Sequence, residues 1–280
     1  MVELTDQTQP LPRGAGDVVR YFARRLPPVV ALRRWSYERH FANAAGEQRL
    51  FRGVYPDFPT AIASAPAAHP IGYDNKASAH RLAEERHHVF PTDYPVLFWL
   101  AHLIGENTVL FDLGGNVGSR YLAFRNHLTY RDSLRWIVSE VPAVVELGRE
   151  IAARENAPHL QFTTSFDELN GAHILLASGV LQFLEDWIGF LRAVPNRPPH
   201  VLINRTPVYA ARSAVTLHST GTAFCPYHLF NRTEFVAAFV DLGYRLVDEW
   251  ANPGIGCYIP QHHASSIDAY SGFYFVHSGA

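Results

Sequence analysis

The residues whose types and spacing point most directly to chemistry lie in one short segment, residues 109–119. Three apolar residues precede Asp112, and glycines at positions 114, 115 and 118 follow it. The apolar run predicts a strand buried on both faces, and the glycines let the backbone turn sharply and approach a ligand without side-chain obstruction. The next residues return to helical spacing. The segment therefore predicts a strand, a nucleotide-cofactor loop and the start of a helix.

The spacing of these glycines separates two cofactor classes. A dinucleotide-binding loop reads G-x-G-x-x-G, whereas this segment reads D-x-G-G-N-x-G from Asp112 to Gly118. A nicotinamide-dependent oxidoreductase on a similar sheet is therefore disfavoured.

The same pattern, D-x-G-x-(G/N)-x-G, resembles motif I of the class I S-adenosylmethionine-dependent methyltransferases, with Asn116 at the middle glycine position. The ligand's amino-acid tail carries an ammonium that favours a nearby anion, and its sulfonium is repelled by cations. Asp112 supplies negative charge, and the loop has no lysine. The resemblance implies that S-adenosylmethionine is bound by Asp112, Gly114, Gly115, Asn116 and Gly118.

Strand and helix patterns alternate from residue 107 onward, which is typical of a parallel sheet covered by helices. We expect an α/β, Rossmann-like class I methyltransferase fold, with a seven-stranded, mostly parallel sheet, helices on both faces and an N-terminal helical cap. The predicted strands are 107–113, 134–140, 159–164, 172–177, 199–205, 244–250 and 272–277, and the predicted helices are 117–128, 142–155, 180–191 and 232–242.

Ligands of such sheets bind beyond the carboxyl ends of the strands, near the point where strand order reverses. Glu140 follows the second strand, and one carboxylate can accept hydrogen bonds from both hydroxyls of a ribose. The alternative is a solvated acid before a helix N-terminus. Residues 139–147 also resemble the second-strand region of small-molecule O-methyltransferases, so we place Glu140 and Val141 in the cofactor site.

The ends of the third and fourth strands supply further candidates. Ser165 and Phe166 are expected beside the adenine, although Phe166 could equally pack in the core, and Ser165 is preferred to Asp167 because Asp167 could cap a helix. Ser178 and Gly179 follow the fourth strand, where the glycine lets backbone approach the cofactor.

A broader resemblance, to a group of bacterial methyltransferases without an assigned substrate, spans residues 50–277. It implies a class I fold with an added N-terminal segment, but no acceptor. The stretches that carry it are 51–55, 72–74, 93–96, 112–118, 178–183, 204–207, 226–227 and 243–244.

We expect three parts: a flexible leader (1–16), an N-terminal helical cap or lid (17–104) and a cofactor domain (105–280). The basic, amphipathic segment 18–37, broken at Pro27–Pro28, could lie on a membrane, but arginines covering the solvent face of the cap are the preferred interpretation. Within the cofactor domain, residues 206–230 look irregular, and long loops in compact domains are usually functional, so they form our substrate-loop candidate.

That segment holds the candidate catalytic residues. If the acceptor is a hydroxyl, a nearby base helps, and His228 is the first choice, followed by His218 and Tyr227. Tyr73, Asn204 and Arg205 are expected to contact the acceptor, although Arg205 could instead pair with a structural acid.

Composition limits the remaining functions. A formal net charge of −2 gives no reason to expect nucleic acid as a partner, and no apolar run is long enough to span a membrane. With two cysteines and no signal-peptide pattern, a cytoplasmic protein is expected. The pairs His87–His88 and His262–His263 lack metal-ligand spacing, so no metal is expected.

The preferred function is methyl transfer to an oxygen or nitrogen of a small molecule or glycan precursor. A catalytically degenerate subunit that binds the cofactor without turnover is the alternative. The expected partner is the small-molecule acceptor, and a homodimer stays open.

Overall fold

The computed structural model describes residues 26–45, 49–84 and 86–279, which fall into two units that divide after Ala44. The first unit contains the described helix α2 (Pro27–Asn43). The predicted leader and the first part of the basic segment lie outside the described residues. Pro27–Pro28 was expected to break a helix, but α2 begins there, because a proline in the first helical turn lacks only an N–H that has no partner in the helix.

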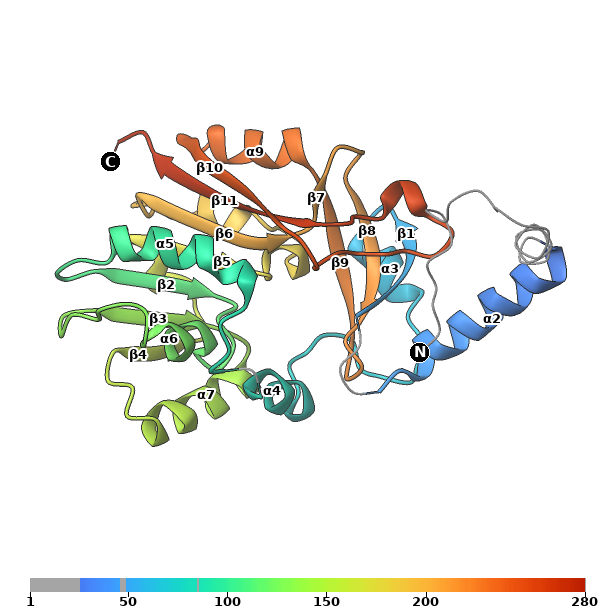
Figure 1. Cartoon of the computed structure of the whole chain (residues 1–280), viewed down its shortest axis with the longest axis horizontal. Coiled ribbons are helices and arrows are strands. Elements are labelled where there is room, and N and C mark those ends of the chain that lie inside the picture. Colours follow the sequence, from blue (N-terminus) through green and yellow to red (C-terminus); the bar gives the residue numbers. More distant parts are fainter. Residues whose placement is uncertain (1–25, 46–48, 85, 280) are drawn as a thin grey trace, which may run out of the picture. The chain divides into compact units, whose positions relative to one another are not determined.

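The large sheet of the second unit confirms the predicted fold. Its strand order is β10-β11-β6-β5-β2-β3-β4, and every strand is parallel to its neighbours except β11, which runs antiparallel to both β10 and β6 (Figure 1). The strand order reverses at β2, which lies between β3 and β5. The seven strands are β2 (Val109–Leu113), β3 (Arg135–Ser139), β4 (Leu160–Thr163), β5 (Ile174–Ser178), β6 (His200–Thr206), β10 (Tyr244–Asn252) and β11 (Tyr270–His277).

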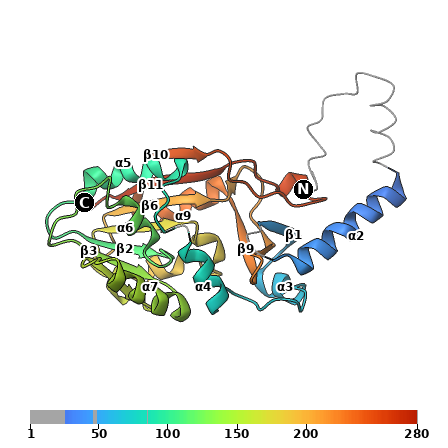
Figure 2. The ribbon, with the colours of Figure 1, turned by 60° about the horizontal axis from the view of Figure 1, so that its bottom comes forward.

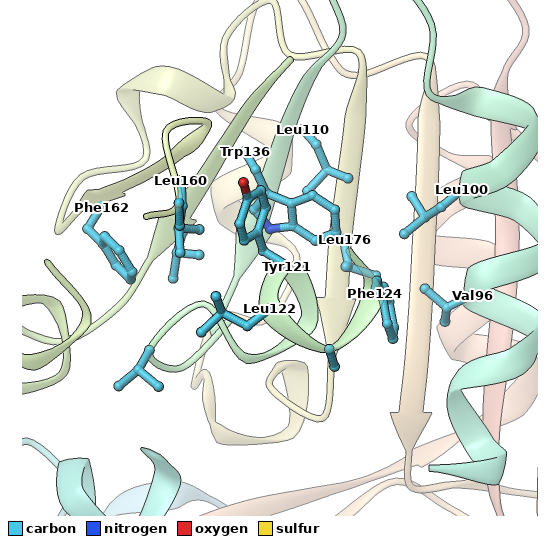
Figure 3. Close-up of a cluster of buried hydrophobic side chains, with 14 of the residues drawn as sticks. Val96, Leu100, Leu110, Tyr121, Leu122, Phe124, Trp136, Leu160, Phe162 and Leu176 are labelled. Atoms are coloured by element: carbon cyan, nitrogen blue, oxygen red, sulfur yellow. The ribbon is translucent and has the colours of Figure 1, made fainter. Parts of the chain in front are cut away.

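Two hydrophobic cores cover the faces of this sheet. On one face, α5 (Tyr94–Leu103), α6 (Ser119–Phe124) and α7 (Pro142–Arg154) pack against Leu110, Trp136 and Leu176 (Figure 3). On the other, α9 (Arg232–Val240) packs Phe235 and Phe239 against the strands. Successive side chains of a strand point to opposite faces, so each central strand contributes to both cores.

A second, four-stranded sheet corrects the expectation for residues 206–230. The segment is not an irregular loop: it forms β7 (Val208–Tyr209), β8 (Ala214–Ser219) and most of β9 (Phe224–Asn231). The sheet order is β1-β8-β9-β7, and β1 (Leu50–Tyr55) comes from the region expected to be helical. The helix α3 (Phe58–Ala63) covers one face of this sheet, beside β9 and β1 in Figure 2.

Other helices follow local signals in part. Asn75 caps α4 (Lys76–Ala83) by accepting a hydrogen bond from the Ser78 N–H. The predicted helix 180–191 is wrong in its middle, because only η3 (Leu181–Phe183) and α8 (Gly189–Arg192) are helical. Among the described residues, no helix has the length and apolar character needed to cross a bilayer.

The buried pair Trp136–Asp112 joins β3 to β2, and the Trp136 indole N–H donates to the Asp112 carboxylate at 2.9 Å. We expect Trp136→Phe to lower the free energy of unfolding by about 1–3 kcal/mol, because it leaves a buried carboxylate oxygen without its donor. Chemical denaturation monitored by circular dichroism measures the change. Trp35→Phe is the control, since Trp35 is exposed. Equal stability of the two variants would contradict the importance of this bond.

Candidate functional site

A pocket of about 270 Å³ lies at the carboxyl ends of the central strands. Gly114 follows β2, Glu140 follows β3, Ser178 ends β5 and Arg205 lies near the end of β6, and all four line it. The pocket is therefore at the reversal of strand order, where ligands of open α/β sheets bind.

The glycine loop forms one wall of this pocket through Gly114 and Asn116. Asn116 has φ of +56°, in the left-handed region that glycine and asparagine adopt most readily, which explains how it replaces a glycine. A Cβ atom on Gly115 would lie 2.5 Å from the Asp112 carboxyl group. The loop can therefore turn this tightly only with glycine at position 115.

Asp112 lies beneath the loop and does not line the pocket. Its carboxylate is 1% exposed and accepts the Trp136 indole N–H, and burial raises its pKa to about 7. The structure therefore does not place Asp112 where a direct contact with a ligand in the pocket was expected. Asp112 instead supports the loop from below.

Glu140 occupies the position predicted for a ribose-binding carboxylate. It lines the pocket and accepts hydrogen bonds from the backbone N–H groups of Asn116 at 3.2 Å and Val141 at 3.1 Å. These bonds hold the carboxylate beside the glycine loop, whereas the Val141 side chain does not line the pocket. Burial raises the pKa of Glu140 to about 7, opposed by the two backbone bonds.

The other predicted cofactor contacts, at the ends of β4 and β5, divide into two groups. Ser178 and Gly179 line the pocket, and a Cβ on Gly179 would meet nothing closer than 3.8 Å, so its backbone faces open space. Ser165 accepts the Asp167 N–H, and Phe166 stacks on Phe190 at 5.5 Å between ring centroids. Neither of these two lines the pocket.

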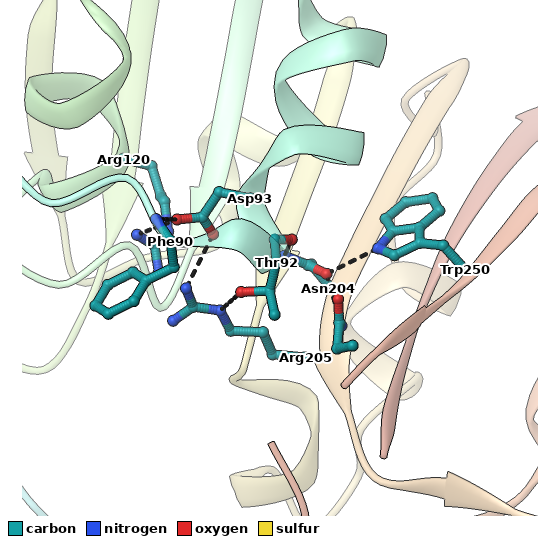
Figure 4. Close-up of polar contacts among 8 residues, drawn as sticks. Phe90, Thr92, Asp93, Arg120, Asn204, Arg205 and Trp250 are labelled. Carbon is teal, nitrogen blue, oxygen red and sulfur yellow. Dashed lines mark hydrogen bonds and ion pairs between the residues drawn. The ribbon is translucent and has the colours of Figure 1, made fainter. Parts of the chain in front are cut away.

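A buried ion cluster forms a further wall (Figure 4). The Asp93 carboxylate pairs with Arg205 at 3.0 Å and with Arg120 at 3.1 Å, and both arginines line the pocket. Arg205 has φ of +53°, a strained conformation for arginine that is held by this pairing. The two interpretations of Arg205, ligand contact and structural pair, are thus compatible.

Asn204 is a structural residue. Its side-chain amide donates to the Thr92 carbonyl at 2.9 Å, and its side-chain oxygen accepts from Trp250 and Asn252. It is completely buried and does not line the pocket. The expected contact with an acceptor is therefore not supported.

The small sheet supplies the opposite side of the pocket. His218 of β8 and Tyr227 of β9 point into it from one face of that sheet, and the Tyr227 hydroxyl lies 2.8 Å from the Tyr270 hydroxyl. His228 lies on the other face, against Phe58, where its ring bonds the Glu185 carbonyl. Successive side chains of β9 point to opposite faces of the sheet. His228, the first-choice base, therefore lies outside the pocket, whereas His218 and Tyr227 line it.

Tyr73 lines the pocket as expected from its place in the turn before α4. The sequence interpretation missed several lining residues: Arg49, Arg81, Arg120, Gln182 and Tyr270. Local patterns gave no signal for the first two. Arg120 could have been found, because it lies two residues after Gly118 in the first turn of the helix that the glycine loop opens.

Comparisons with known proteins found no matching family model and no matching curated protein. Solved structures do resemble the chain. The mitomycin 7-O-methyltransferase is 18% identical over 66% of this chain, with a TM-score of 0.43, and the match spans 54% of that enzyme. The 1,6-didemethyltoxoflavin-N1-methyltransferase of Burkholderia thailandensis is 14% identical, with a TM-score of 0.47 and coverage of 76% of this chain and 94% of that one.

The magnesium protoporphyrin IX methyltransferase of Synechocystis PCC 6803 is also 14% identical, with a TM-score of 0.48 over 73% of this chain and 88% of that one. The large sheet, with antiparallel β11 between β6 and β10, has the seven-stranded, mostly parallel form that the sequence predicts. The chain thus has the class I methyltransferase fold.

We expect Asp93→Asn to lower the free energy of unfolding by about 3 kcal/mol, because it leaves two largely buried guanidinium groups without their counter-ion. Urea denaturation measures the change. Glu106→Gln is the matched control: its partner Arg131 is exposed, so the expected cost is below about 1 kcal/mol. A cost for Asp93→Asn no larger than the control's would show that the cluster does not stabilise the fold.

Proposed function

We propose that the chain is an S-adenosylmethionine-dependent methyltransferase that acts on an oxygen or nitrogen of a small molecule. The observation that carries the proposal is the Glu140 carboxylate, fixed by two backbone N–H groups beside the glycine loop in the pocket. A fixed carboxylate of this kind fits the two hydroxyls of a ribose.

The other pocket residues also fit this cofactor. The hydroxyls of Ser119 and Ser178 and the side-chain oxygen of Gln182 are buried without hydrogen-bond partners, and all three residues line the pocket. Such groups are costly to leave unpaired, so they favour a polar ligand. The guanidinium groups of Arg120 and Arg205 also line the pocket, held by Asp93, and a guanidinium suits the carboxylate of the cofactor's amino-acid tail.

When bound, this cofactor supplies an electrophilic methyl group on a sulfonium. The chain's part is to hold an acceptor in line with that methyl group and to exclude water, and such positioning accounts for several kcal/mol of barrier lowering. The pocket retains two of the base candidates, His218 and Tyr227, and we favour His218. Burial lowers its pKa to about 3, so its imidazole is neutral at pH 7 and can accept a hydroxyl proton at a ring nitrogen.

Isothermal titration with S-adenosylmethionine, S-adenosylhomocysteine and NAD tests the cofactor. We expect the two sulfur compounds to bind and NAD not to compete. Glu140→Gln should weaken S-adenosylhomocysteine binding about tenfold or more, since it removes charge-assisted hydrogen bonds. Absence of binding to wild type, or displacement by NAD, would refute the proposal. Binding by wild type without product formation from any acceptor would favour the degenerate binding subunit.

The pH dependence of binding gives a second test of Glu140. Ribose hydroxyls donate to the ionised carboxylate, and its pKa is about 7, so affinity should rise by up to about tenfold between pH 6 and pH 8. Glu140→Gln should abolish this rise. Asp112→Asn is the control, because Asp112 also has a pKa of about 7 but does not line the pocket, so that variant should keep the rise. A flat profile in wild type would exclude Glu140 as the ribose contact.

The backbone of Asn116 provides a third test. Asn116→Gly should keep S-adenosylhomocysteine binding within about threefold of wild type, because glycine adopts positive φ without strain. Asn116→Val should lose binding, since a β-branched residue is an outlier at this φ. Calorimetry measures both, and equal binding by the two variants would show that the loop conformation is not required.

A further inference from the structure

We infer that the acceptor is a small hydroxylated acid whose carboxylate or phosphate binds Arg81 and Arg49 and whose hydroxyl meets His218. The inference rests on the proposed methyltransferase function and adds to it the chemical class of the acceptor.

Arg81 is the first group that points to an anion. It projects from α4 into the pocket, and its Nε atom is buried without a hydrogen-bond partner. Glu84, one turn later, also lines the pocket, yet within residues 49–84 and 86–279 no ion pair joins Arg81 to a carboxylate. A guanidinium with a buried, unpaired N–H favours a ligand with an acceptor oxygen.

Arg49 adds a second cation on the same side. It lines the pocket just before β1, and its guanidinium carbon lies 5.4 Å from the centroid of the Tyr270 ring. The groups that influence its charge are Tyr227, Tyr270 and Cys257, which are neutral at pH 7. The positive charges of Arg49 and Arg81 both lower the pKa of His218, so the three residues lie around one region of the pocket.

His218 is the independent observation that this region binds a ligand. Its side chain is buried, and neither ring nitrogen has a hydrogen-bond partner. The ring stacks on Phe51 at 4.7 Å and lies 5.9 Å from Phe183, so packing fixes its orientation. A buried imidazole with two unused nitrogens costs free energy in the absence of a ligand, and a hydroxyl supplies the missing partner.

The distribution of charge over the pocket favours an anion beside Arg49 and Arg81. Arg120 and Arg205 are neutralised in part by Asp93, and Glu140 lies beside the glycine loop. Among the described residues, the side built from α4, the residue before β1, and β8 therefore has two cations and one lining acid, Glu84. An acidic acceptor complements it, and a cationic one is repelled.

An anion on these arginines also assists the transfer step. The O–CH₃ bond of the product forms as the S–CH₃ bond breaks, the sulfonium becomes a neutral thioether, and the hydroxyl proton moves to a ring nitrogen of His218. Arg49 and Arg81 lower the proton affinity of that imidazole. A bound carboxylate or phosphate offsets their charge, so His218 becomes a better base when the acceptor is present.

The test uses protein saturated with S-adenosylhomocysteine and matched probes that differ in charge. The carboxylate pair is 4-hydroxybenzoate and 4-hydroxybenzamide, the phosphate pair is glucose 1-phosphate and glucose, and inorganic phosphate is the minimal anion. We expect at least one anion to bind tenfold or more tightly than its neutral counterpart, measured by calorimetry up to about 10 mM. The pair that shows the preference identifies carboxylate or phosphate as the source of charge.

Variants then connect the preference to the arginines. Arg81→Gln should weaken the anion about tenfold, Arg81→Lys should keep part of the affinity, and Arg154→Gln, an exposed change on α7, should have no effect. Retained S-adenosylhomocysteine binding shows that each variant is folded. Three results would overturn the inference: no anion binding to the loaded wild type, equal binding of the neutral probes, or an unchanged affinity of Arg81→Gln for the anion. If the wild type does not bind S-adenosylhomocysteine, the proposed function itself is refuted.

Discussion

One buried carboxylate, that of Asp93, ties together the elements that form the pocket. It accepts the Phe90 N–H at 3.0 Å before η1 (Pro91–Asp93), and it pairs with Arg120 of α6 and Arg205 of β6. These groups come from three distant parts of the sequence. Removing a guanidinium group from water costs free energy, and the ion pairs with Asp93 offset this cost. The shared carboxylate therefore holds both guanidinium groups in fixed positions.

The glycine loop and Glu140 depend on a second constraint, which is backbone geometry. Left-handed conformations at Gly114, Asn116 and Gly118 direct the loop over Asp112 and bring the Asn116 N–H to Glu140. The carboxylate is then already hydrogen-bonded and oriented before a ligand arrives. Preorganisation of this kind lowers the ordering cost of binding.

The two sheets have separate tasks in this arrangement. The large sheet supplies the glycine loop, Glu140 and Gly179, which suit a nucleoside cofactor, and the small sheet supplies His218 and Tyr227. Both sheets belong to the same unit of the chain, and residues of both line one pocket. Under the proposed function, the acceptor can therefore change through residues of the small sheet without altering the glycine loop.

The seven strands of the large sheet, the glycine loop and the place of Glu140 follow from local sequence patterns, because buried apolar runs, glycines and capping residues act locally. The side of the pocket built from the small sheet needed the tertiary structure. Six of the eight residues of β9 are buried, all except His228 and Asn231, and residues 224–227 form an unbroken buried run, so no polar alternation marks a strand or its inner face. The register that turns His218 and Tyr227 inward and His228 away is fixed by the pairing of β8 with β9, its partner in a hairpin, and with β1, which is distant in sequence.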